Sequence, residues 1–132
     1  MQPIQTLGVA IPRPGFGTFR MPGNGSPPAA ESALGLGYRH IGTAAMYENE
    51  DAVGAVIAAS EVPRNDLFVT TKVSHDQRAT DAIRKAFMQL DYVDLYMVHW
   101  PSRDMDIAAV METPMALRVE GRTKAVGVCD FN

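Results

Sequence analysis

The sequence has little of what marks secreted, membrane-bound or nucleic-acid-binding proteins. Its 132 residues include one cysteine, Cys129, which has no partner for an internal disulfide. No apolar run approaches the roughly 18 residues of a membrane helix, and the N-terminus lacks the basic-then-apolar pattern of a signal peptide. The formal net charge is −3, without a basic segment for a nucleic acid. These absences predict one cytoplasmic domain, residues 1–132, whose partner is a small molecule and not a membrane or a nucleic acid.

What the sequence does contain is an alternation of strand and helix patterns. Apolar runs typical of buried strands are expected at 15–19, 38–44, 67–73, 91–100 and 124–131. Helical patterns are expected at 26–35, 47–60, 81–88 and 106–120, with Ser26 capping the first and Pro114 weakening the last. The proline-rich opening, residues 3–14, predicts a hairpin or cap. Such alternation predicts an α/β fold with a parallel sheet, while periodicity alone does not distinguish an open sheet from a barrel.

Residues able to do chemistry follow three consecutive expected strands. In parallel α/β proteins, ligands bind beyond the carboxyl ends of the strands. Tyr47 follows the second strand, Lys72 ends the third and His99 ends the fourth. A lysine cation lowers the pKa of a nearby tyrosine, and a histidine can hydrogen-bond a substrate oxygen. Together these three residues suit the reduction of a carbonyl group.

Each of the three also has an ordinary structural explanation. Tyr47 alone is typical of an aromatic residue at a helix start, and Lys72 of a strand-end lysine that reaches solvent. His99 alone is typical of a core histidine whose hydrogen bonds are satisfied. Only their joint placement at neighbouring strand ends favours catalysis.

Other binding motifs are missing from the sequence. The glycine pairs at 15–17 and 35–37 lack the third glycine of a dinucleotide-binding fingerprint, and there is no Walker sequence. No set of histidines and acidic residues has metal-ligand spacing, so no metal site is predicted. Cys129 has no base beside it in the sequence and is better explained as a small buried hydrophobe than as a nucleophile.

Several segments resemble those of the aldo-keto reductases. In order they are GFGTF, GYRHIGTAAMYENEDAVG, LFVTTKV, DYVDLYMVHWP and AVGVCDFN. The resemblance covers nearly the whole chain and implies a (β/α)8 TIM-barrel type of fold opened by a short N-terminal hairpin. It implies NADPH-dependent interconversion of aldehydes or ketones with alcohols, without a metal. In that scheme Tyr47 matches the proton donor, Lys72 the cation that tunes it, and His99 the residue that orients the substrate carbonyl.

The resemblance also implies cofactor and substrate contacts at the strand ends. Thr18, Phe19, Cys129 and Asp130 match positions that bind the cofactor near its nicotinamide, and Phe19 and Trp100 match positions that bind the substrate. The family usually has serine and asparagine where this chain has Cys129 and Asp130. An ionised Asp130 accepts hydrogen bonds but cannot donate one to the nicotinamide carboxamide.

Other departures from the family bear on activity and completeness. Gly42 stands where the family has an aspartate that pairs with the lysine, so Lys72 loses its expected partner and the activity is expected to be impaired. The third helix is expected to be about 7 residues shorter than usual. The chain ends after the fifth strand, which predicts a truncated, incomplete barrel of about five strands and four helices. Its open edge strands favour self-association.

Two interpretations follow from the sequence. In one, the chain is an impaired NADPH-dependent carbonyl reductase; in the other, it is a catalytically inactive α/β module that binds or assembles.

Overall fold

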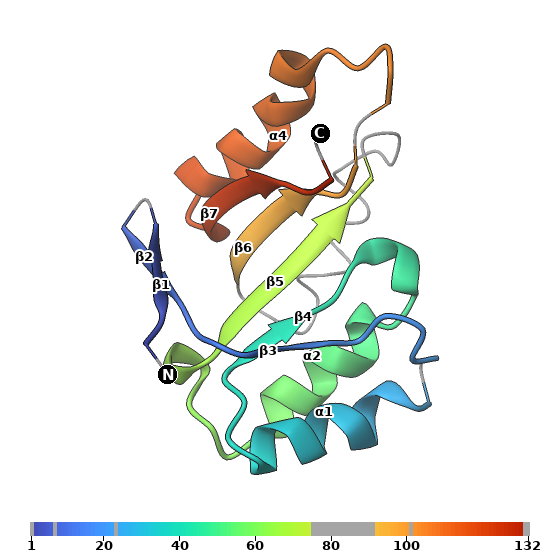
Figure 1. The fold of residues 1–132 in the computed structure, drawn as a ribbon, viewed down its shortest axis with the longest axis vertical. Coiled ribbons are helices and arrows are strands. Elements are labelled where there is room, and N and C mark those ends of the chain that lie inside the picture. The colour runs from blue at the N-terminus through green and yellow to red at the C-terminus, as the bar shows by residue number, and fades with distance from the viewer. Residues whose placement is uncertain (1, 7, 23, 75–91, 101, 131–132) are drawn as a thin grey trace.

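The computed structural model describes residues 2–6, 8–22, 24–74, 92–100 and 102–130. Its centre is a parallel sheet whose strands are ordered β3-β4-β5-β6-β7, each beside its neighbour in the chain (Figure 1). The strands are β3 (Gly15–Gly17), β4 (His40–Gly42), β5 (Phe68–Val73), β6 (Val93–Val98) and β7 (Thr123–Val128). The order has no reversal, unlike that of doubly wound sheets, and this is the strand order of a (β/α)8 barrel.

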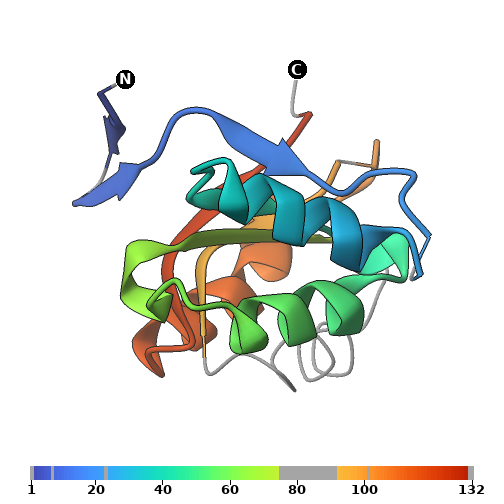
Figure 2. The ribbon, with the colours of Figure 1, turned by 90° about the horizontal axis from the view of Figure 1, so that it is seen from below.

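The helices of the described residues lie between these strands in the chain. They are α1 (Ser26–Gly35), α2 (Glu50–Ala59) and α4 (Ile107–Val119), with short 3-10 turns η1 (Ala45–Tyr47) and η2 (Arg64–Asp66). The α1 and α2 helices lie against each other on one face of the sheet, and α4 packs along β6 and β7 (Figure 2). The helix expected at 81–88 and its expected shortening lie outside the described residues. No helix among the described residues is long and apolar enough to span a membrane.

The hydrophobic core lies between the sheet and the α1 and α2 helices. Ile41 and Val69 on the strands are fully buried, as is Ala30 on α1. They form one cluster with Leu34, Val53, Val56, Ile57, Leu67, Val73, Val93 and Tyr96. Burying each large aliphatic side chain contributes about 1.5–3 kcal/mol, so this cluster anchors β4 and β5 against the helices. Because side chains alternate along a strand, the residues directly before and after Ile41 and Val69 face the other side of the sheet.

The N-terminal hairpin is confirmed. Strands β1 (Ile4–Thr6) and β2 (Val9–Ile11) pair antiparallel, with Thr6 opposite Val9. Gly8 in the turn has φ +81°, a conformation that glycine adopts without steric cost. Every residue of β1 is exposed, so the hairpin is an added cap and not part of the core.

Some expected element boundaries were wrong. Ser26 does not cap α1 as expected: it is the first residue of the helix, and Gly25 is at the cap position. The backbone N–H groups of Gly25 and Ser26 both donate hydrogen bonds to the Pro22 carbonyl, so the chain is already turning at these residues. The first sheet strand ends at Gly17 and not at 19. Residues 18–21 form a turn closed by a hydrogen bond from the Met21 N–H to the Thr18 carbonyl, 3.2 Å. Pro114 lies inside α4 as expected and is buried.

Candidate active site

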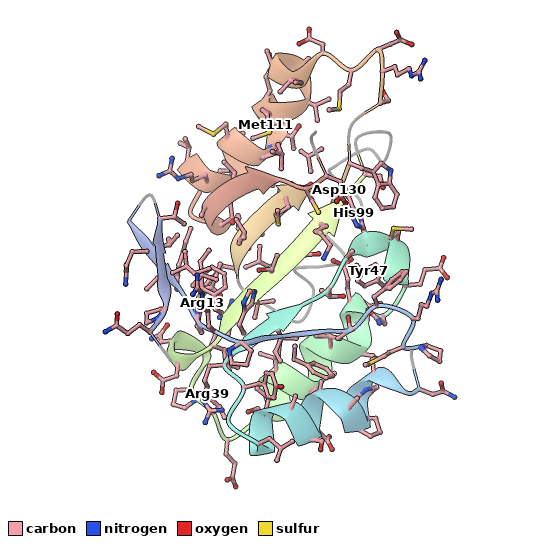
Figure 3. The ribbon with its side chains drawn as sticks, in the orientation of Figure 1. Arg13, Arg39, Tyr47, His99, Met111 and Asp130 are labelled. Atoms are coloured by element: carbon pink, nitrogen blue, oxygen red, sulfur yellow. The ribbon has the colours of Figure 1, made fainter. Side chains whose placement is uncertain are left out.

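Three side chains predicted from the sequence meet at the carboxyl end of the sheet. Figure 3 shows Tyr47, His99 and Asp130 at one end, and Arg13 near the opposite end. The Lys72 Nζ lies 5.2 Å from the centroid of the Tyr47 ring. The Tyr47 and His99 rings are 6.1 Å apart in an edge-to-face arrangement. The three groups are therefore close enough to contact one small molecule.

Lys72 reaches this position because of its place in β5. Val69 and Val73 on the same strand belong to the core on the helix side, so Lys72 projects from the other face. Its Nζ donates a hydrogen bond to the backbone carbonyl of Thr43, 3.1 Å. Burial lowers the pKa of Lys72, while Cys129 and Asp130 act in the opposite direction. The lysine is thus held by a neutral backbone group beside Gly42.

Gly42 is not required by the backbone or by crowding. Its φ lies outside the positive range, and an added Cβ would meet only the Phe16 carbonyl oxygen, at an ordinary 3.8 Å. The backbone at this position therefore accepts a residue with a Cβ. The absence of a carboxylate beside Lys72 is a property of the sequence and not of the fold.

The hydroxyl of Tyr47 is a weaker acid than usual. Burial raises its pKa, and the negative charges that Cys129 and Asp130 carry when ionised raise it further. This is opposite to the lowering expected from Lys72. The lysine contacts the face of the ring, and within the described chain no hydrogen bond joins its Nζ to the hydroxyl. The structure therefore keeps Tyr47 protonated at neutral pH.

One ring nitrogen of His99 lacks a hydrogen-bond partner in the part of the chain that the structure describes. The residue is buried, and its Nδ1 makes no hydrogen bond within the described chain. Burial lowers the pKa of His99, Lys72 lowers it further and Asp130 opposes both. A buried ring nitrogen left unpaired is unusual for a structural histidine and is typical of a group that meets a ligand.

Two exposed aromatic side chains flank the site. The Phe19 ring lies 5.2 Å from the Tyr47 ring and is 57% exposed. The Trp100 ring lies 3.9 Å from the His99 ring and is 38% exposed. Large exposed aromatic residues beside a cluster of polar groups are typical of binding sites. The structure thus places both predicted substrate-side residues next to the predicted catalytic ones.

The remaining predicted cofactor residues lie at the same end of the sheet. Thr18 is fully buried, and its hydroxyl donates to the Gly42 carbonyl at 3.2 Å. Asp130 is exposed and has a left-handed φ of 58°. Cys129 is half-buried and not fully buried as expected, because it follows the last residue of an edge strand. Its Sγ donates a hydrogen bond to Asp130 Oδ2 at 3.3 Å. Burial raises the pKa of the thiol, and the Asp130 carboxylate raises it further.

Sequence reasoning missed Asn49. This residue is 1% exposed and precedes α2, yet its side chain makes no helix cap. Its amide instead bonds the turn that follows β3 and the hydroxyl of Thr43. An asparagine just before a helix, two positions after Tyr47, was the available signal, but its partners are distant in the sequence.

A sheet in consecutive parallel order, with its polar cluster at the carboxyl ends of the strands, defines the fold as part of a (β/α)8 barrel. The model of the aldo/keto reductase family matches residues 15–132, and the chain belongs to this family.

Relatives of known name support this assignment. An aldo-keto reductase of Mycolicibacterium smegmatis is 39% identical over 140 residues, covering 99% of this chain and 51% of that protein. The methylglyoxal reductase DkgB of Escherichia coli O157:H7 is 38% identical over 131 residues, which are 93% of this chain and 49% of that protein. The solved structure of a putative 2,5-diketo-D-gluconic acid reductase B superposes with a TM-score of 0.91 at 38% identity, and the match covers 100% of this chain and 49% of that one. The chain spans about half the length of the curated relatives it matches.

Proposed function

We propose that this chain carries the catalytic residues of an NADPH-dependent carbonyl reductase whose substrates are small aldehydes or ketones such as methylglyoxal. The observation that carries the proposal is the convergence of Tyr47, Lys72 and His99 at one rim, where a ring nitrogen of His99 has no hydrogen-bond partner among the described residues. The names of relatives such as methylglyoxal reductase DkgB support the substrate class.

The rim fits the nicotinamide end of such a cofactor. Phe19 presents an exposed ring face, Asp130 is an exposed acceptor, and His99 leaves a buried nitrogen without a partner in the described chain. Phe19, Cys129 and Asp130 would hold the nicotinamide, and Thr18, which is fully buried, would support the turn that carries Phe19. When bound, NADPH supplies the hydride that reduces the carbonyl carbon.

The side chains of the site perform the proton chemistry. His99 is neutral at pH 7 because burial lowers its pKa, and it hydrogen-bonds the carbonyl oxygen of the substrate. Tyr47 then gives its hydroxyl proton to that oxygen as the alcohol forms. The Lys72 ammonium, 5.2 Å from the ring centroid, stabilises the phenolate that remains. The raised pKa of Tyr47 makes proton donation harder, which predicts slow turnover.

The test follows NADPH oxidation by the purified chain with methylglyoxal. Tyr47→Phe keeps the ring contacts and removes the proton, so we expect it to lower kcat by at least ~100-fold. Tyr92→Phe is the matched control, because the Tyr92 hydroxyl donates to Asn65 Oδ1 (3.1 Å), away from the rim. This control should change kcat by less than about twofold. Equal rates for the parent and Tyr47→Phe, or a parent inert toward a panel of aldehydes, would overturn the proposal.

Gly42 favours a second candidate, a module that binds but does not reduce. Lys72 is held by the Thr43 carbonyl and has no carboxylate at position 42. The edges of the described sheet, β3 and β7, are the places where another chain could pair. This candidate predicts NADPH binding, measured by cofactor fluorescence, without oxidation, together with concentration-dependent association in sedimentation. A monomer that turns over would exclude it.

A further inference from the structure

The Asn49 side chain joins two loops of the rim. Its Nδ2 donates to the carbonyls of Thr18 (3.1 Å) and Met21 (2.8 Å). Its Oδ1 accepts from the Thr43 hydroxyl (2.9 Å) and lies 3.5 Å from the Thr18 hydroxyl, which donates its single proton to the nearer Gly42 carbonyl (3.2 Å). With 1% exposure, the amide is sheltered from water, and hydrogen bonds in such surroundings are costly to break.

The two donated bonds fix one turn at both ends. Residues 18–21 reverse direction here, and the Met21 N–H bonds the Thr18 carbonyl at 3.2 Å. Between these ends lie Phe19 and Arg20, and Arg20 has a left-handed φ of 57°. The Phe19 ring, which is 57% exposed, contacts Tyr47 at 5.2 Å and the Arg20 guanidinium at 5.2 Å. The position of Phe19 therefore depends on the backbone that Asn49 holds.

The accepted bond reaches the opposite loop. The Thr43 hydroxyl donates a hydrogen bond to Asn49 Oδ1, and the Thr43 backbone carbonyl accepts one from Lys72 Nζ at 3.1 Å. Tyr47 lies two residues before Asn49, so the same amide is tied to the loops that carry Phe19, Tyr47 and the acceptor of Lys72. A primary amide provides two N–H donors and an acceptor oxygen in one short side chain. A carboxylate of the same size provides no donor.

We propose that Asn49 is a positioning residue that sets the separation of the Phe19 and Tyr47 rings and thereby the width of the substrate site. Its role in substrate binding rests on the proposed reductase function; its role in holding the turn does not.

The experiment compares Asn49→Asp with the parent chain. The substitution is close to isosteric and keeps the acceptor for Thr43, but it presents a carboxylate to two carbonyl oxygens. Hydrogen exchange measured without ligands should quicken by at least about tenfold at the turn 18–21 and stay unchanged in β5. The KM for methylglyoxal should rise by about tenfold with kcat within about threefold, because the reacting groups remain and the substrate wall moves.

A pH series separates this role from general damage. Protonation of the introduced carboxylate restores one O–H donor, so exchange at 18–21 in Asn49→Asp, corrected for intrinsic rates, should slow again as the pH falls. Asn65→Asp is the matched control; Asn65 is exposed, and its Oδ1 accepts from the Tyr92 hydroxyl at 3.1 Å. This control should change exchange at the turn by less than about twofold. Asn49→Ser, smaller and uncharged, covers the case in which the carboxylate prevents folding; it should loosen the turn by about threefold.

The outcomes distinguish the two proposals. Faster exchange at the turn in a chain that never oxidises NADPH supports the positioning role and contradicts the reductase function. Unchanged exchange in both Asn49 variants overturns the positioning role whether or not the parent is active. A uniform loss of activity that follows the folded fraction, with KM unaltered, also overturns it.

Discussion

At the amino end of the sheet the Asp94 carboxylate is 1% exposed and pairs with Arg64 at 2.9 Å and Lys124 at 2.7 Å. It also accepts the Val69 backbone N–H at 2.8 Å. At the carboxyl end, the half-buried Lys72 donates to a neutral backbone carbonyl, and the buried His99 Nδ1 has no hydrogen-bond partner within the described chain. At the amino end, the protein itself therefore neutralises the buried charge of Asp94. At the carboxyl end, polar groups remain able to bind a ligand.

This difference follows a general division in barrel folds. Groups at the amino ends of the strands contribute mainly to stability, and groups at the carboxyl ends contribute to function. Buried polar atoms without partners cost stability, which a protein tolerates where a ligand can complete the bonds. Substitutions at the amino end should therefore change the free energy of unfolding, whereas those at the rim should change rates and pH dependence.

The largest expected effect is at the amino end. Asp94→Asn removes the charge that matches two cations, and breaking a buried ion pair typically costs 3–5 kcal/mol. Because Lys124 is 47% exposed and can regain water, we expect a loss of about 3 kcal/mol in urea unfolding. Asp66→Asn, at an exposed position of η2, is the matched control. A loss below about 1 kcal/mol would contradict the division between the two ends.

A second effect is expected from a half-buried acid behind the rim, Glu50. Glu50 accepts a hydrogen bond from the Thr71 hydroxyl, and burial raises its pKa from 4.5 to about 7. Between these values the unfolded chain loses this proton and the folded chain keeps it, so stability falls as the pH rises. Glu50→Gln should stabilise the chain by about 2 kcal/mol near pH 8 and by little near pH 4.

Urea unfolding across this pH range checks the prediction, with Glu61→Gln as an exposed control. If the stability difference between the parent and Glu50→Gln does not grow with pH, ionisation of Glu50 at the carboxyl end does not destabilise the folded chain.

The smallest expected effect concerns Gly42. An added Cβ at Gly42 would meet only the Phe16 carbonyl oxygen, at 3.8 Å, and would lie on the face of the sheet that carries Lys72, so an aspartate would bring a carboxylate toward this lysine. We expect Gly42→Asp to raise kcat by about tenfold, equivalent to about 1.4 kcal/mol, with little change in unfolding. Gly35→Asp, where an added Cβ meets nothing within 4 Å, is the matched control. An unchanged rate would mean that the Thr43 carbonyl is a sufficient partner for Lys72.

The sequence predicted the parts of the molecule that local rules determine. Strand ends in a parallel sheet share one edge, so Tyr47, Lys72 and His99 were correctly expected to lie together. The turn 18–21 was missed because it is held by Asn49, 28 residues from Met21. The raised pKa of Tyr47 was also missed, since it depends on burial and on charges at the end of β7. Long-range hydrogen bonds and desolvation leave no periodic signal.

The consecutive strand order has a consequence for how the chain acquires its structure. Every sheet strand from β4 onward pairs with the one synthesised just before it, so the sheet can grow in the direction of translation. Ile41 and Val69 can become enclosed by α1 and α2 before β7 leaves the ribosome. Such neighbour-to-neighbour assembly closes shorter loops than pairing between distant strands would, which lowers the entropic cost of forming the sheet.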